Sequence, residues 1–160
     1  MADSSASGPT IRKLLSYRVH SVANLLSRGA ALRYRREFDV SLWEWRTVAL
    51  LGEAGPWSLQ ALAGAAALDK GQMSRVVAGL VERGLVARAV DCDDARGVRL
   101  TLTRDGRRVC AGLLRSAAER NRTFESVLTA RERAQLESIL AKLGAAARDL
   151  IERERAANVL

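Results

Sequence analysis

Arg75 lies in a segment whose residue types and spacing favour contact with nucleic-acid bases rather than covalent catalysis. At roughly 100° per residue, a helix over residues 70–83 has an apolar arc on one side and mostly small residues opposite it. The apolar arc comprises Met73, Val76, Val77, Leu80 and Val81, and the opposite face comprises Gly71, Arg75, Ala78 and Glu82, flanked by Ser74 and Gly79. Such a face can approach another surface closely around its long cation, as reading base edges in a major groove about 12 Å wide requires.

The ends of this helix are marked by its flanking residues. Asp69 is a good N-cap, Gln72 follows three residues later as in a capping box, and Gly84 suits a helix C-terminus. A core helix with a small-residue packing face would carry the same pattern. The helix alone therefore leaves both interpretations open, and the residues that follow it favour the first.

A two-stranded ribbon is predicted directly after this helix. Residues 85–90 and 98–102 are short runs of aliphatic and β-branched residues, and Val98, Leu100 and Leu102 alternate with polar residues as in a half-buried strand. The polar residues 91–97, which end in glycine, predict a hairpin loop with Arg96 at its tip. The order of helix, short helix and hairpin is that of a winged helix-turn-helix.

Five further helices complete a mainly α chain. Apolar residues at helical spacing predict a first helix over residues 10–35, Ser41 begins a second that ends near Glu53, and Ser58 begins a third, alanine-rich one that extends to residue 67. Thr103 caps a fifth helix. A capping box at residues 129–132 opens a sixth, and its apolar stripe needs a covering surface.

Residues 42–106 resemble the MarR family of bacterial transcription factors. The resemblance is carried by residues 42–51, 72–75 and 80–86, and above all by the run Asp94-Ala-Arg-Gly-Val-Arg-Leu-Thr-Leu-Thr-Arg-Asp-Gly106. It implies about six helices plus a β wing, and a homodimer held by N- and C-terminal helices. The expected domains are a disordered segment 1–9, a dimerisation region 10–40 and 104–160, and a winged helix-turn-helix 41–103.

The function expected from this resemblance is that of a homodimeric repressor on double-stranded DNA. Two reading helices related by a two-fold axis would bind an inverted repeat. The alternative is a winged-helix module that docks another protein without specific DNA recognition.

We expect eight residues to contact DNA. Arg75 suits guanine, and Gln72 could read adenine if its capping position leaves it free. Lys70 and Ser74 would meet phosphates or neighbouring base edges. Ser58 begins a helix whose amides can bind phosphate. In the wing, the resemblance places Arg96 in the minor groove, with Asp94 orienting its side chain. Arg99 points outward from its strand, toward the DNA backbone.

The resemblance also implies release by a small aromatic or phenolic ligand. Candidate contacts are aromatic rings, a titratable nitrogen and a cation, namely Tyr17, His20, Trp43, Trp45 and Arg46. The alternative is that these tryptophans belong to the core and that the histidine is simply hydrogen-bonded.

The composition of the chain limits its possible partners and cofactors. A net charge of +8 favours a polyanionic partner, and 48% hydrophobic residues allow a real core. One histidine and two cysteines, Cys92 and Cys110, are too few for a structural zinc site, and neither a glycine-rich phosphate loop nor a catalytic triad is present. We therefore expect no enzyme activity and no cofactor. The sequence has no apolar run of 18 or more residues and no hydrophobic signal stretch, which predicts a cytoplasmic protein without a membrane partner. A redox role for Cys92 or Cys110 is disfavoured but left open.

Overall fold

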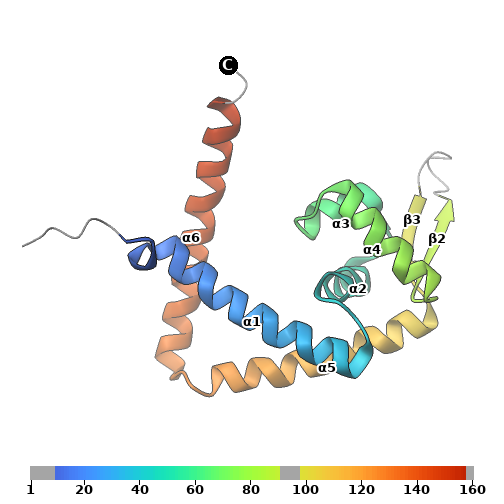
Figure 1. The fold of residues 1–160 in the computed structure, drawn as a ribbon, viewed down its shortest axis with the longest axis horizontal. Coiled ribbons are helices and arrows are strands. Elements are labelled where there is room, and N and C mark those ends of the chain that lie inside the picture. The colour runs from blue at the N-terminus through green and yellow to red at the C-terminus, as the bar shows by residue number, and fades with distance from the viewer. Residues whose placement is uncertain (1–9, 91–97, 158–160) are drawn as a thin grey trace, which may run out of the picture. The chain divides into compact units, whose positions relative to one another are not determined.

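The structure is a computed structural model that describes residues 10–90 and 98–157. It divides into two compact units, one ending at Ala117 and the other beginning at Ala118. Residues 1–9, 91–97 and 158–160, which include the predicted disordered segment and the predicted hairpin loop, lie outside the described residues. The elements in chain order are η1 (Ile11–Lys13), α1 (Leu15–Phe38), α2 (Leu42–Ala54), β1 (Trp57–Ser58), α3 (Leu59–Ala65), α4 (Lys70–Glu82), β2 (Val86–Val90), β3 (Val98–Leu102), α5 (Arg104–Glu125) and α6 (Ala130–Ala157) (Figure 1).

Side-chain caps set the starts of α2, α3 and α4, as predicted. Ser41 opens α2 with a full capping box, and the Ser58 hydroxyl accepts the Ala61 N–H at the start of α3. The Asp69 carboxylate accepts the Gln72 N–H at 2.7 Å in the first turn of α4. The end of α4 is a Schellman motif, because Gly84 has a φ of 67° and the following N–H bonds back to the Leu80 carbonyl.

Three predicted helix boundaries were wrong. The first helix does not run over residues 10–35, because Leu14 is extended and separates η1 from α1. At its other end α1 continues to Phe38 and closes at Asp39, whose left-handed backbone (φ 51°) is tolerated by a short polar residue. The third helix ends at Ala65 rather than residue 67, because Ala67 is left-handed (φ 54°).

The sheet has three antiparallel strands in the order β1-β3-β2, one more than the predicted ribbon. β1 adds two residues to the edge of β3, with Trp57 opposite Leu100 and Ser58 opposite Arg99. Two residues are too few to show the alternation by which a strand is recognised in a sequence. The predicted inward face of β3 is confirmed for Leu100 and Leu102, but Val98 is 47% exposed.

The core of the first unit fixes the position of α4. Three side chains of α4 are fully buried in the same core as side chains of α2, α3 and α5. The α4 residues are Met73, Val77 and Leu80, and the others include Val48, Leu62 and Leu113. Thr47 is also buried, and its hydroxyl donates to the Met73 sulfur at 3.7 Å. Since α4 buries one whole side in this core, its opposite side must face outward.

The second unit comprises the end of α5 and α6. The predicted capping box is confirmed, because the Thr129 N–H donates to Glu132 at 2.7 Å and the Glu132 N–H returns to the Thr129 hydroxyl. These hydrogen bonds from Thr129 hold the pKa of Glu132 below its usual value, against the opposing effect of burial. No residue of α6 is buried, and Leu136, Ile139, Leu140, Leu150 and Ile151 are exposed. None of the helices within residues 10–90 and 98–157 is long and apolar enough to cross a membrane.

Candidate nucleic-acid interface

The exposed side of α4 is built as its sequence predicts. Met73, Val77 and Leu80 are buried, and Val76 and Val81 are half-buried beside them. The exposed residues of α4 are Lys70, Gly71, Gln72, Arg75, Ala78 and Glu82, with Ser74 and Gly79 half-buried between the two sides. The N-terminal half of α4 therefore presents small residues and two cations to solvent.

Arg75 lies over the first turn of α4. Its Nη1 atom is 3.9 Å from the position that a Cβ on Gly71 would occupy, so the side chain runs back along bare backbone toward the helix N-terminus. Among residues 10–90 and 98–157, no hydrogen bond or ion pair involves its guanidinium. The fork of five donors is therefore available to an acceptor outside this part of the chain.

Gln72 is free to act as a second reading residue. Its backbone N–H satisfies the Asp69 cap at 2.7 Å, but its side chain makes no hydrogen bond to the described part of the chain. The competition between capping and reading that the sequence suggested is therefore absent, because only the backbone of Gln72 takes part in the cap.

Ser58 and Arg99 face each other across β1 and β3. Direct partners in an antiparallel pair point to the same face of the sheet. Ser58 is exposed and also caps α3, whereas Arg99 is half-buried on the side opposite Leu100. The β3 arginine and the α3 N-terminus are thus neighbours. Asp94, Arg96 and Cys92 lie outside the described residues.

Four of the five candidate effector contacts line two separate hollows, and Trp43 lines neither of these two. Trp45 and Arg46 line one of about 410 Å³ between α2 and the end of α3, whose other walls are alanines and Leu50. Tyr17 and His20 line a second, of about 300 Å³, beside η1. The Arg46 guanidinium lies 4.9 Å from the centre of the exposed Trp43 ring.

Two of these aromatic and polar groups already have internal partners. The Trp45 ring packs against the buried Tyr34 with centroids 5.3 Å apart, so part of its surface belongs to the core. His20 hydrogen-bonds the Asn24 amide at 2.8 Å on α1. The α2–α3 hollow is therefore the better candidate, since it combines an indole, apolar walls and a cation.

Cys110 is a buried thiol on α5 whose sulfur donates to the Val48 carbonyl at 3.6 Å. Burial raises its pKa, so the protonated form is favoured. This environment suits a packing residue rather than a reactive thiolate.

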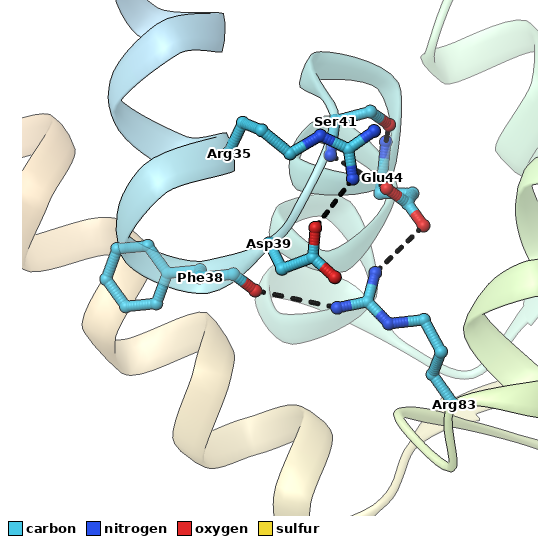
Figure 2. A network of polar contacts seen from close by, with 6 residues as sticks. All are labelled: Arg35, Phe38, Asp39, Ser41, Glu44 and Arg83. Atoms are coloured by element: carbon cyan, nitrogen blue, oxygen red, sulfur yellow. Dashed lines mark hydrogen bonds and ion pairs between the residues drawn. The ribbon is translucent and has the colours of Figure 1, made fainter.

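Two features of the first unit were missed in the sequence. A Cβ on Gly106 would overlap the Leu85 carbonyl oxygen, so this glycine lets α5 start directly against β2. Arg83, at the end of α4, bonds to Glu44 on α2 and to the Phe38 carbonyl on α1 (Figure 2). The capping-box spacing of Ser41 and Glu44 was available in the sequence, but no local pattern reveals a partner 39 positions away.

Known proteins share this architecture. Residues 40–98 match the profile of the MarR family. The HTH-type transcriptional regulator FarR of Neisseria gonorrhoeae is 31% identical over 100 residues, which span 62% of this chain and 68% of FarR. A MarR/EmrR family transcriptional regulator of Acinetobacter sp. ADP1 superimposes with a TM-score of 0.79 at 25% identity, covering 88% of this chain and 99% of that one.

A structure determined with DNA shows the same fold. The S. aureus MepR–DNA complex has a TM-score of 0.76 at 21% identity over 84% of this chain and 98% of MepR. The sequence relationship and the shared winged-helix fold agree. This chain belongs to the MarR family of transcriptional regulators.

Proposed function

We propose that this regulator is a homodimeric repressor that binds an inverted-repeat operator through α4. The observation that carries the proposal is the exposed side of α4, where Arg75 lies over Gly71 with no partner among residues 10–90 and 98–157 and no bulky apolar residue of α4 is exposed. A bidentate arginine is the commonest specific contact to guanine in the major groove. Since the family comprises transcriptional regulators, the chain is not an enzyme.

The proposed contacts fall into two groups. Arg75 and Gln72 read base edges, because their side chains are exposed on α4 and are not bonded within the described part of the chain. The other proposed contacts position the protein on phosphates or in the minor groove, and they are Ser58, Lys70, Ser74, Asp94, Arg96 and Arg99. MepR, which shares this fold, was solved in complex with DNA, and this supports double-stranded DNA as the partner.

The dimer is proposed from apolar faces that each unit leaves uncovered. The first half of α1 is exposed along its length, including Leu15 at 57%, Val22 at 57% and Leu25 at 68%. In the second unit, α6 buries none of its apolar residues. A second copy of the chain would cover these faces, with packing inside one chain as the alternative. Two copies would set their α4 helices about 34–36 Å apart, one turn of DNA.

The ligand is proposed to be a small aromatic or phenolic anion in the α2–α3 hollow. Trp45 and the apolar walls would cover its ring, and Arg46 would pair with its charge. A thermal-shift screen with aromatic carboxylates tests this proposal. We expect a stabilisation that Arg46→Ala abolishes, whereas no shift with any compound would argue against a ligand of this class.

A gel-shift experiment tests the central proposal. The probe is the DNA immediately beside the gene for this chain, and the control is the same sequence with one half of its inverted repeat scrambled. We expect preference for the intact repeat and a log K that falls by about 0.9 per contacted phosphate for each unit of log salt concentration. Equal binding to both probes would overturn operator recognition and would favour the protein-docking alternative.

A further inference from the structure

Arg83 joins the C-terminal end of α4 to two other helices. Its Nη1 donates to Glu44 Oε1 on α2 at 3.1 Å, and its Nη2 donates to the carbonyl oxygen of Phe38 at the end of α1 at 3.5 Å (Figure 2). The two side chains of the ion pair are 33% and 16% exposed, so solvent only partly screens their attraction. The guanidinium fork constrains direction as well as distance, which a single donor does not.

Glu44 is held in place from its other side. Its Oε2 accepts the Ser41 N–H at 2.7 Å, and its own N–H donates to the Ser41 hydroxyl at 3.2 Å. Both oxygens of this carboxylate are therefore engaged, one by the cap of α2 and the other by α4. The carboxylate is therefore held at the N-terminus of α2 and is not free to rotate about its side-chain bonds.

Phe38 is fixed by its ring as well as by its helix. A Cβ on Gly112 of α5 would lie 2.6 Å from Phe38 Cε1, so the ring fills the space that this glycine leaves open. One turn further on, the Ser116 hydroxyl donates to Glu37 at 2.9 Å. The junction that Arg83 contacts is thus a place where α1, α2 and α5 are packed together within the first unit.

We infer that Arg83 and Glu44 are positioning residues for operator recognition, an inference that rests on the proposed function. They set the tilt of α4 from its C-terminal end, whereas Arg75 and Gln72 act near the other end. A helix of 13 residues is about 20 Å long, so a tilt of about 5° at one end moves the other by about 1.7 Å. A displacement of this size breaks a hydrogen bond to a base edge.

Neutralising Glu44 distinguishes a positioning role from a simple effect of charge, because the two predict opposite changes in affinity for the operator. Removing a negative charge strengthens binding to any DNA through the phosphates. Removing a positioning contact weakens binding to the operator and leaves non-specific binding unchanged. Glu44→Gln separates the two effects, because the glutamine oxygen can still accept the Ser41 N–H, whereas its NH2 group replaces both the charge and the oxygen that Arg83 binds. The exposed Glu82 on the last turn of α4 supplies the matched control, Glu82→Gln.

The experiment compares affinities for the intact inverted repeat and its scrambled form, with circular dichroism as the check on folding. For Glu44→Gln we expect operator affinity to fall roughly tenfold, with affinity for scrambled DNA within about twofold of the wild-type value. Glu82→Gln should leave the ratio of the two affinities unchanged. An unchanged ratio in Glu44→Gln would overturn the inference.

Arg83 variants give a second, independent test. Arg83→Lys keeps the charge but loses the fork, so we expect the ratio of operator to scrambled affinity to fall as in Glu44→Gln. In Arg83→Met the slope of log K against log salt should stay at the wild-type value, and a decrease of about 0.9 would show a direct phosphate contact and overturn the positioning role. A wild-type chain without operator preference would reject the proposed function itself, whereas preference retained by the variants would reject only this inference.

Discussion

Arg75 combines the two properties that a base-reading side chain needs, namely donors without a partner in the described part of the chain and a route along bare backbone to the start of its helix. We expect Arg75→Ala to cost about 1–3 kcal/mol of operator binding and to relax the preference at one base position. Arg75→Lys keeps the charge but cannot make the bidentate contact, so it should lose the same base preference. Competition binding with single-base operator variants measures both effects. Arg148→Ala on α6 is the charge-matched control and should leave the base preference intact.

The lowered pKa of Glu37 predicts that the stability contributed by the contact between α1 and α5 depends on pH. Burial acts to raise its pKa, but hydrogen bonds from Ser116, Arg33 and Arg36 and the charge of Arg33 outweigh burial and hold the pKa below its usual value. A carboxyl with a lowered folded-state pKa stabilises the fold above its unfolded pKa of about 4.3 and loses this effect as the pH falls through the lowered value.

The measurement is the melting temperature of the wild type and of Glu37→Gln between about pH 3 and pH 7. The wild type should melt higher at neutral pH, and the difference should shrink below about pH 4.3. A difference that stays constant over the whole range would show that the carboxylate charge has no part in this contact.

At the scale of elements, the turn between α3 and α4 contains a strained residue. Ala67 has a φ of 54°, and a left-handed alanine costs roughly 1–2 kcal/mol. Because glycine also gains entropy in the unfolded chain, we expect Ala67→Gly to stabilise the protein by about 0.5–1 kcal/mol net. Urea unfolding measures the change. Ala61→Gly, inside α3, should destabilise the protein by about 0.5–1 kcal/mol, and stabilisation by both would refute the account of the turn.

The elements that the sequence predicted well are those whose signals are local. The caps at Ser41, Ser58 and Asp69 and the apolar arc of α4 involve residues within four positions of each other, and the structure confirms them. The C-terminal boundaries of α1 and α3 were less well predicted, because each helix is followed by a non-glycine residue in the left-handed region, Asp39 after α1 and Ala67 after α3. Such residues carry no sequence signal as clear as that of Gly84.

At the scale of the whole molecule, the proposed dimer can be tested on α6. Ile139 is 52% exposed in an apolar stripe. We expect Ile139→Glu to give monomers and to abolish the preference for an inverted repeat, because a charge cannot be buried unpaired between two copies. Sedimentation velocity and the gel shift measure the two outcomes. Ala141→Glu adds the same charge away from the stripe and should remain dimeric, and a dimeric Ile139→Glu would contradict the proposed interface.

The sequence by itself determined the helices and their caps, the exposed side of α4 and the resemblance to a regulator family, because periodicity and capping depend on residues close together in the chain. Only the tertiary structure decided that β1 joins the sheet, that four of the candidate effector residues line two separate hollows, and that Glu44 meets Arg83 across 39 positions. The physical reason is that each of these depends on how elements pack together. Contacts between residues far apart in the chain leave no periodic pattern in the sequence.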